Sequence, residues 1–464
     1  MKKLFAWMMV CVLVLSSFFA VHAFAASDFD VQNGVLVKYN GTSSDVTVPS
    51  GVTAVGATAF MNNTAVRSVT LPSSVYAVGE RAFWGCTALS TVSGGDNVNE
   101  VGDLAFQNTP YLNNSTAKYL MLGNVLLWYN GTADSVTIPS RCTAVASYAF
   151  LRCTYLTSFT AYEGLISVGT GAFYGCSKLS SVSLPSTVSS VGAYAFDGTP
   201  YLSASGAFAV DGDGVLIKYN GSDSNVEIPY GVKRIAPHAF ESSKITSVTV
   251  PETVYAIDAL AFADCTGLSE IDLSDGLVMI GDSAFRGCKS LTQLITPSTL
   301  SYIGQKAFTG SALTGASLPG DDLTVSYNAF KGCESLNYVL LSSGVTAVYD
   351  NAFDGCKALG GVSVPKNLTD ISSASFSGCG NVTVCCDADT KALTALSAYP
   401  ANTLMGDVDG DELLSIIDAS HIQCFRAKIE DFSGAQTAAA DINFDGEANI
   451  IDAVDIQKTI AKID

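Results

Sequence analysis

Two short segments near the C-terminal end of the chain carry oxygen-bearing side chains at alternate positions, a pattern that could bind calcium. They run from Asp407 to Asp418, "DVDGDELLSIID", and from Asp441 to Asp452, "DINFDGEANIID". Calcium takes about six to eight hard oxygen ligands, which alternate residues of a tight loop can supply. The predicted ligands are Asp407, Asp409, Asp411, Ser415, Asp418 and the Leu413 carbonyl in the first loop, and Asp441, Asn443, Asp445, Asn449, Asp452 and the Glu447 carbonyl in the second. We therefore predict two Ca²⁺ ions.

The two loops belong to a duplicated unit. The segments that begin at Asp407 and Asp441 start 34 residues apart and share the same residue at 11 of 24 positions. Each loop is followed by a segment with helical periodicity, which would fix the carboxylate at the twelfth loop position. The segment 400–406 before the first loop has no such periodicity and contains Pro400. The helix that enters an EF-hand is therefore missing, and one helix should follow each loop.

This loop–helix duplication, with Asp at the twelfth position, resembles a dockerin. The resemblance implies calcium-dependent docking to a cohesin module on a scaffoldin, in either of two orientations related by a half turn. The residues that would face the cohesin are Ile416, Ile417, Lys428, Ile450, Ile451 and Lys462. The Ile-Ile pairs replace the Ser-Thr pair of many dockerins, so the class of cohesin stays open. Glu412 stands where the second loop has Gly446, which predicts weaker calcium binding by the first loop.

The isoleucine pairs have an alternative explanation as ordinary helix core. Adjacent residues on a helix point in different directions. At least one member of each pair should therefore be exposed.

Most of the chain before the loops repeats a unit of 23 residues, marked by an Ala-Phe or Ser-Phe pair. Most steps between these phenylalanines are 23 residues, two are 22 and two are 44. The phenylalanines are Phe60, Phe83, Phe106, Phe150, Phe173, Phe196, Phe240, Phe262, Phe285, Phe308, Phe330, Phe353 and Phe376. Segments such as "SVTLPSSV" predict short strands ended by tight turns, and Gly79, Gly169 and Gly281 are expected to turn the chain. The repeat predicts a β-rich solenoid of about 13 coils.

The repeat "LPSSVYAVGERAFWGCTAL" resembles the BspA-like subfamily of leucine-rich repeats found on bacterial surfaces. The resemblance covers Val46 to about Val384 and implies a scaffold for adhesion or ligand binding. The expected fold class is therefore a β-rich leucine-rich-repeat solenoid followed by a small all-α calcium-binding dockerin domain.

A longer repeat of 90 residues lies over the shorter one. "GVLVKYNG" begins at Gly34, "NVLLWYNG" at Asn124 and "GVLIKYNG" at Gly214. Apolar segments on both sides of Asn-Gly predict β-hairpins, the first of which would cover the N-terminal edge of the solenoid. The other two predict insertions near residues 107–135 and 197–225. Trp128 replaces a lysine of the other copies, which makes it either an aromatic contact for a ligand or a packing residue of the insertion.

Most cysteines occupy one position of the repeat, three residues after its phenylalanine. They are Cys86, Cys153, Cys176, Cys265, Cys288, Cys333, Cys356 and Cys379, and other coils have Asn, Thr or Ser there. A position shared by these residues needs a small side chain with some capacity for hydrogen bonding. We therefore predict a buried ladder, with disulfides or a metal site as the alternative. A bridge from Cys379 to Cys385 or Cys386 stays open.

The ends of the chain suggest export and a modular order. Residues 1–25 have the basic, apolar and small-residue regions of a signal peptide. The predicted order is then the solenoid at 26–386, a helical cap at 387–399, a linker at 400–406 and the dockerin at 407–464. A formal net charge of −19 disfavours nucleic acid and anionic lipid as partners. No later segment predicts membrane insertion, so we expect an extracellular protein held at the cell surface through a scaffoldin.

The sequence proposes no catalytic site. His238 and His421 lack a Ser or Cys partner nearby, and the acids of the solenoid form no cluster. The preferred function is a non-catalytic cellulosome component that presents its repeat surface to an unknown protein or glycan. The alternatives are an adhesin for cell or host attachment and, with less support, a glycan-degrading enzyme.

Overall fold

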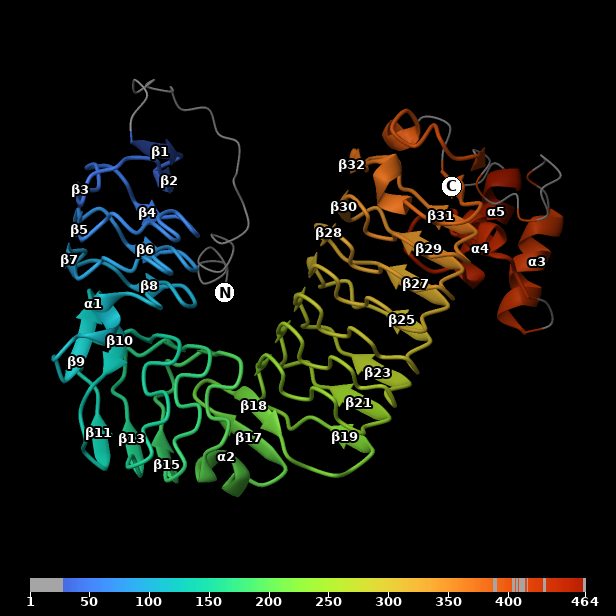
Figure 1. Cartoon of the computed structure of the whole chain (residues 1–464). Coiled ribbons are helices and arrows are strands. Elements are labelled where there is room, and N and C mark those ends of the chain that lie inside the picture. Colours follow the sequence, from blue (N-terminus) through green and yellow to red (C-terminus); the bar gives the residue numbers. More distant parts are fainter. Residues whose placement is uncertain are drawn as a thin grey trace. The chain divides into compact units, whose positions relative to one another are not determined.

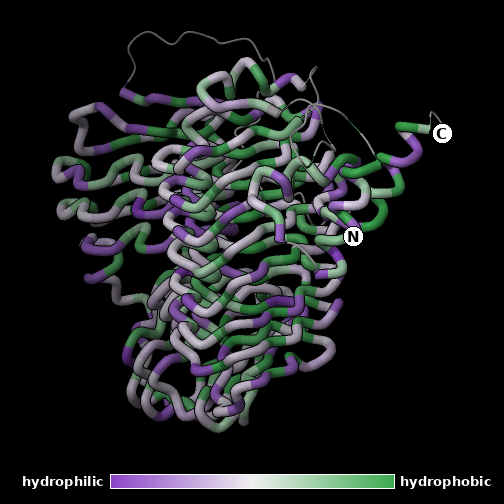
Figure 2. Tube along the Cα trace, turned by 90° about the vertical axis from the view of Figure 1, so that its right-hand side faces the viewer, coloured by the Kyte–Doolittle hydropathy of each residue, from purple (hydrophilic) through white to green (hydrophobic). Residues whose placement is uncertain are grey.

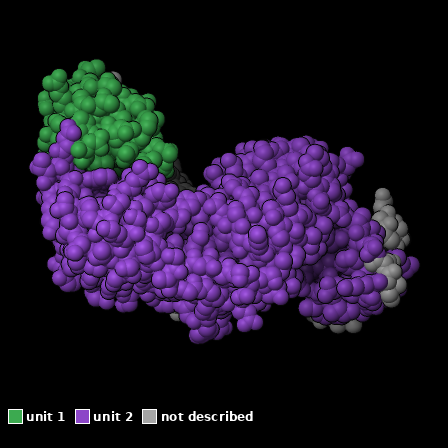
Figure 3. All heavy atoms as spheres, turned by 60° about the horizontal axis from the view of Figure 1, so that its bottom comes forward, with its two compact units in different colours: residues 1–95, 104–113 green, residues 96–103, 114–464 purple. Residues whose placement is uncertain are grey.

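A computed structural model of the chain describes residues 28–386, 390–402, 405, 408, 414, 416–428 and 431–461 (Figure 1). The predicted signal peptide at residues 1–25 lies outside the described residues. The chain divides into two compact units, the first with residues 1–95 and 104–113 and the second with residues 96–103 and 114–464 (Figure 3). Within the described part of the chain, no helix is long and apolar enough to cross a membrane.

The first unit consists of solenoid coils that begin with an antiparallel hairpin. Its elements are β1 (Phe29–Gln32), β2 (Val35–Tyr39), β3 (Asp45–Thr47), β4 (Ala54–Val55), β5 (Ser68–Leu71), β6 (Ala77–Val78), β7 (Thr91–Gly94) and α1 (Pro110–Asn113). Strands β1, β2, β4 and β6 lie in one sheet, and β3, β5 and β7 form another. A coil thus adds one short strand to each sheet, and equivalent residues pair in parallel, as Val46 does with Val69.

The second unit continues this design and ends in three helices. Its strands before residue 230 are β8 (Glu100–Val101), β9 (Tyr119–Leu122), β10 (Val125–Tyr129), β11 (Ser135–Thr137), β12 (Ala144–Val145), β13 (Ser158–Thr160), β14 (Ser167–Val168), β15 (Ser181–Ser183), β16 (Ser190–Val191), β17 (Phe208–Asp211), β18 (Val215–Tyr219) and β19 (Asn225–Glu227), with α2 at Pro200–Ala204. Strands β9, β10, β12, β14 and β16 form one sheet, and β11, β13 and β15 form another.

The strands after residue 230 complete the solenoid. They are β20 (Arg234–Ile235), β21 (Ser247–Val250), β22 (Ala256–Ile257), β23 (Glu270–Leu273), β24 (Met279–Ile280), β25 (Gln293–Ile295), β26 (Tyr302–Ile303), β27 (Gly315–Leu318), β28 (Leu323–Val325), β29 (Tyr338–Leu341), β30 (Val345–Val348), β31 (Gly361–Ser363), β32 (Asp370–Ile371), β33 (Thr383–Cys385) and β34 (Ala401–Asn402). The sheet ordered β25-β27-β29-β31-β33-β34 is called the late sheet below. The C-terminal helices are α3 (Ile416–Arg426), α4 (Gly434–Ala440) and α5 (Ile450–Ala461).

Stacked aromatic rings form the core of the coils. Successive rings lie nearly parallel, with centroids 5.2 Å apart for both Phe262–Phe285 and Phe285–Phe308. This spacing follows from the distance of about 4.8 Å between neighbouring strands. Apolar and polar segments alternate along the coils in Figure 2, so each coil buries only part of its length. The predicted solenoid with its 23-residue period is confirmed.

The number of coils exceeds the predicted 13, at about 15. The tyrosine of each Tyr-Asn-Gly motif takes the place of the repeat phenylalanine. Tyr39 stacks on Phe60 at 4.9 Å, and Tyr129 and Tyr219 make the equivalent contacts with the next coil. The steps of 44 residues therefore contain a coil of their own.

The hairpins turn at a different place from the predicted one. Strand β1 pairs antiparallel with β2 across Asn33-Gly34, whereas β3, after Asn40-Gly41, pairs in parallel with β5. Asn33 and Gly34 have φ values of 51° and 79°, which suit the two-residue turn of a twisted hairpin. Strands β9 and β10, and β17 and β18, pair in the same way.

The recurring glycines before Ala-Phe serve close packing rather than a special turn conformation. A Cβ atom on Gly79 would lie 2.5 Å from the backbone nitrogen of Ala57 in the preceding coil, and Gly169 and Gly281 are equally confined. The left-handed residues instead flank the phenylalanine, as Arg81 and Gly85 do around Phe83, with φ values of 52° and 71°.

The segment between solenoid and helices differs from the predicted cap and linker. In the cap, only Lys391–Leu393 forms a short 3₁₀ helix, and residues 387–389 lie outside the described residues. In the predicted linker, β34 pairs in parallel with β33 and so extends the late sheet.

Candidate calcium site and partner surface

The second loop, Asp441 to Asp452, folds around its own backbone N–H groups. The N–H of Asp445 donates to Oδ1 of Asp441 and of Asn443 at 3.1 and 2.8 Å. The N–H groups of Asn449 and Ile442 donate to the two carboxylate oxygens of Asp452 at 2.7 and 3.1 Å. These bonds bring the predicted ligand side chains together on one tight loop.

Two carboxylates of this loop, Asp441 and Asp452, are buried without a Lys or Arg partner among the described residues. Burial raises the pKa of Asp441 well above its usual range, and the charges of Asp452 and Asp445 raise it further. Burial also raises the pKa of Asp452 to about 7. In the described part of the chain, no Lys or Arg forms an ion pair with Asp441 or Asp452. A bound divalent cation would supply the missing positive charge.

The donor set is a mixture of oxygens rather than a cluster of acids. No group of three or more His, Cys, Asp or Glu side chains among the described residues is arranged to hold a metal ion. In the predicted set, the side chain of Asn443 and the carbonyl of Glu447 would join the carboxylates, as calcium loops allow. With these included, the residues fit calcium, which would neutralise and crosslink the loop.

The first loop falls largely outside the described residues. The masked predicted ligands are Asp407, Asp409, Asp411, Leu413 and Ser415. Asp418 is described and buried, and its Oδ1 accepts a bond from the N–H of Val408 at 2.8 Å. Asp452 accepts the same bond from Ile442, also ten residues earlier. The two halves therefore share this part of their loop geometry.

The isoleucine pairs lie on the surface of the helices that follow the loops. Ile416 and Ile417 in α3 are 56% and 52% exposed, and Ile450 and Ile451 in α5 are both 53% exposed. The helix-core explanation is therefore wrong for these four side chains, because Ile422 and Ile456 fill that role and are fully buried. Lys428 is exposed, and Lys462 lies outside the described residues.

Comparison with known families accounts for both regions. A family model of the BspA type leucine-rich repeat region matches residues 38–120, 124–204, 218–337 and 256–383. The chain belongs to this BspA-type family. A model of the dockerin type I domain matches residues 405–461, so the BspA-type repeats are followed by a dockerin. Dockerin type I domains are calcium-binding modules, and this one implies a cohesin partner.

Several solved structures are similar to this BspA-type chain. A leucine-rich cell surface protein from Faecalibacterium prausnitzii is 22% identical, covers 82% of this chain and 98% of its own, and has a TM-score of 0.27. A leucine-rich repeat protein from Eubacterium ventriosum is 21% identical, covers 74% of this chain and 88% of its own, and has a TM-score of 0.37. The pneumococcal vaccine antigen PcpA is 18% identical, covers 80% of this chain and 90% of its own, and has a TM-score of 0.32. No curated protein matches the chain.

The cysteine ladder of the BspA-type repeats is confirmed as a hydrogen-bonded core feature. The thiols of Cys86, Cys265 and Cys379 each donate to the carbonyl of the phenylalanine in the preceding coil at 3.0 Å. The described cysteines are all unbridged, including Cys385 and Cys386. A small side chain that can donate a hydrogen bond at this position therefore bonds to a backbone carbonyl of the preceding coil.

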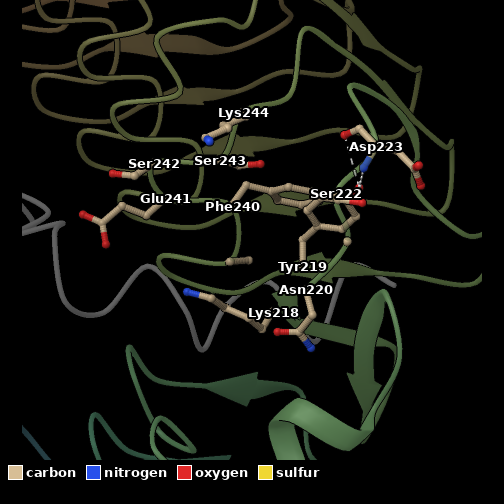
Figure 4. Close-up of a pocket in the computed structure, with 12 residues that line it drawn as sticks. Lys218, Tyr219, Asn220, Ser222, Asp223, Phe240, Glu241, Ser242, Ser243 and Lys244 are labelled. Atoms are coloured by element: carbon tan, nitrogen blue, oxygen red, sulfur yellow. Dashed lines mark hydrogen bonds between the residues drawn. The ribbon is translucent and has the colours of Figure 1, made fainter.

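A small pocket opens where the third hairpin meets the next coil (Figure 4). Its volume is about 330 Å³, and Lys218 and Asn220 lie on one side with Ser242, Ser243 and Lys244 on the other. Trp128, at the position of Lys218 in the second hairpin, is half-buried and donates from its indole N–H to Asn130 Oδ1 at 3.0 Å. The indole N–H thus has a hydrogen-bond partner within its own hairpin.

The sequence did not predict the partners of His238. Its Nδ1 lies 2.7 Å from the hydroxyl of Tyr194 and 2.8 Å from Oε2 of Glu241, and burial together with Glu241 raises the pKa of Tyr194 to about 12. Tyr194 comes from a coil 44 residues earlier, so only the step lengths of the repeat could have pointed to the contact. The group lacks a Ser or Cys nucleophile, and its bonds join the coils of Phe196 and Phe240, which lie on either side of the coil of Tyr219.

Proposed function

We propose that this protein is a secreted, non-catalytic cellulosome component that docks to a cohesin through a dockerin holding two calcium ions. Its repeat surface would then be presented to a protein or glycan. The dockerin match and the signal peptide pattern at residues 1–25 support this proposal, and both families are typically non-catalytic. The proposed modules are the solenoid at 26–386 and the dockerin at 407–464.

The observation that carries the proposal is the exposure of four isoleucines on two helices that pack against each other. Helices α3 and α5 are in contact, and the buried Ile422 and Ile456 lie in one apolar cluster with their neighbours. Ile416, Ile417, Ile450 and Ile451 stay outside that cluster. Adjacent apolar side chains exposed in this way mark a candidate surface for a protein partner. Each pair directly precedes the last ligand of its loop, so calcium would hold it in place.

Cohesin binding by the full mature chain tests this function. A panel of purified cohesins from the source organism is titrated with the protein by calorimetry, in calcium and in excess chelator. We expect binding to at least one cohesin in calcium and none in chelator. Binding that persists in chelator, or no binding to any cohesin, would refute the proposal.

Paired variants test the two-orientation hypothesis for the isoleucines. The double variants Ile416→Asp/Ile417→Asp and Ile450→Asp/Ile451→Asp should each bind nearly as well as wild type, because the other half can dock. Changing all four should weaken binding by about 30-fold or more, as expected for central apolar contacts. Ile460→Asp is the matched control, since Ile460 is 42% exposed on α5 outside the pairs.

The ligand of the repeat surface is an independent part of the proposal. The full chain, in excess calcium, is applied to arrays of glycans and proteins, and the variant Lys218→Ala/Lys244→Ala tests the pocket of Figure 4. Binding that the variant loses would assign the ligand to this pocket. Binding that the variant keeps would place it elsewhere on the repeats.

A further inference from the structure

Each coil places one side chain on the outward face of its outer strand, at a position called the outward slot. The slot is occupied by Thr47, Thr70, Ser93, Thr137, Thr160, Ser183, Glu227, Thr249 and Asp272, which pair in register within their sheets. All of these side chains are polar and exposed. A polar slot is expected for a strand face in contact with water.

The outward slot changes character in the late sheet. Its occupants there are Ile295, Ser317, Leu340, Ser363 and Cys385, again paired in register. Leu340 is 3% exposed, and Ser363 and Cys385 are fully buried. A leucine and a cysteine at a slot that is elsewhere polar indicate a face that is covered. Ile295, at the same slot of the first strand, is 69% exposed, so the covered part of the face begins after it.

Helix α4 of the dockerin covers this face. It lies against β29, β31 and β33, and Leu340 and Cys385 join Ala438 and Ala439 in one apolar cluster. A Cβ atom on Gly361 would lie 2.1 Å from the carbonyl oxygen of Gly434. Both glycines are thus required for this close approach, and at the position of Gly361 the neighbouring strands have Tyr338 and Thr383, with a second glycine, Gly315, one coil further along. The contact of α4 with the late sheet is called the seat.

The second calcium loop touches the solenoid beside the seat. The N–H of Ser343 donates to the carbonyl of Phe444 at 3.0 Å, and the hydroxyl of Ser317 donates to the carbonyl of Gly446. The hydroxyl of Ser363 donates to Oδ2 of Asp441 at 3.3 Å. Asp441 is the first predicted ligand of the loop, so a solenoid side chain bonds directly to a calcium-binding carboxylate. Such partners orient metal ligands and raise metal affinity.

We propose that the solenoid is part of the second calcium site. The seat holds the loop in its binding geometry, with Ser363 as a positioning residue for Asp441, and calcium in turn holds the dockerin on the late sheet. Coupling of this kind is reciprocal, because each binding event must favour the other by the same factor. The inference rests on the proposed function only in assigning calcium to this loop. It does not depend on any cohesin.

Hydrogen exchange of the full mature chain during a calcium titration tests the coupling. Gly361→Val should prevent helix α4 from packing on the late sheet. Leu340→Thr replaces the buried leucine by threonine, the residue at the outward slot in the coils of Thr160 and Thr249. Ser181→Val is the matched control, at the position equivalent to Gly361 in an uncovered strand. The calcium concentration that protects amides 441–452 should rise about tenfold in the two seat variants and about fivefold in Ser363→Ala. It should not change in Ser181→Val.

Chelation supplies the second readout. In wild type, removing calcium should raise hydrogen exchange in residues 434–440 and in β31, while β21 stays protected. Protection of β21 measured in each variant shows that its solenoid is folded. Unchanged calcium midpoints in Gly361→Val and Leu340→Thr, or continued protection of 434–440 in chelator, would overturn the proposal. Failure to bind cohesin with the coupling intact would count against the proposed function alone.

Discussion

The repeat solenoid and the dockerin satisfy their buried polar groups in opposite ways. In the solenoid, the thiol of Cys265 donates to a carbonyl of the preceding coil, and the buried Arg234 meets Asp258 through two bonds of 2.6 Å. In the dockerin, Asp441 and Asp452 are buried beside each other without a Lys or Arg partner among the described residues. In the solenoid, neighbouring coils satisfy the buried polar groups, whereas in the dockerin the proposed calcium ion would do so.

This difference follows from size and repetition. A coil has a near copy of itself on each side, so a donor in one coil finds an acceptor at the same place in the next. The dockerin has two short loops and three helices and can bury only a small core. Under the proposed function, metal ligation would therefore supply part of its folding free energy.

Removing calcium should separate the two regions most sharply. At concentrations about 100-fold above the Kd, two bound ions stabilise the folded dockerin by about 5 kcal/mol in total. We expect chelator to abolish the dockerin transition in calorimetry while the solenoid transition keeps its Tm. A solenoid transition that shifts as strongly as the dockerin transition would show that the two regions do not differ in this way.

Truncating the aromatic stack should have the next largest effect, on the solenoid alone. Phe285 is fully buried between two parallel rings, so Phe285→Ala should cost about 4 kcal/mol through the cavity that it leaves. Denaturant unfolding in excess calcium measures this loss. The control is Tyr230→Ala, at a side chain that is 78% exposed, where a change of less than about 0.5 kcal/mol is expected.

In the buried ion pair of the solenoid, Arg234 supplies the positive charge beside a buried carboxylate, as calcium would in the dockerin loop. Asp258→Ala leaves the guanidinium of Arg234 buried without its carboxylate partner, which should cost about 3 kcal/mol. The exposed pair Lys357–Glu334, with a contact of 2.6 Å, provides the control, because Glu334→Ala should cost less than about 1 kcal/mol. Equal losses in the two variants would mean that burial of Arg234 does not matter.

The cysteine ladder should give the smallest effect. Burial raises the pKa of the Cys265 thiol to about 12, so almost none of it is the reactive thiolate at neutral pH. A thiol reagent should therefore label Cys265 only after unfolding. Cys288→Ser should cost about 1 kcal/mol or less, because a hydroxyl can donate to the same carbonyl. Rapid labelling of Cys265 in the native protein would contradict the hydrogen-bonded interpretation.

The repeat was predictable because its signals are local and recur. The Ala-Phe pairs gave the period and the stacked core, and the spacing of Asp441, Asp445 and Asp452 gave the second loop. The Tyr-Asn-Gly coils were missed because tyrosine replaced the marker phenylalanine, although Tyr39 and Phe60 are 21 residues apart. The hairpin turn was misplaced because Asn33-Gly34 and Asn40-Gly41 are equally good turn pairs. Only the pairing partners of the strands distinguish them.

By itself, the sequence determined the solenoid period, the ladder of small donors and the candidate ligands, because each depends on spacing within or between identical units. The tertiary structure decided which outward slots are covered and which groups meet across long intervals. Ser363 and Asp441 are 78 residues apart, and Tyr194 and His238 are 44 apart. No repeat signal relates Ser363 to Asp441. Their contact exists because helix α4 packs on the late sheet, where Gly361 and Gly434 allow the two backbones to approach.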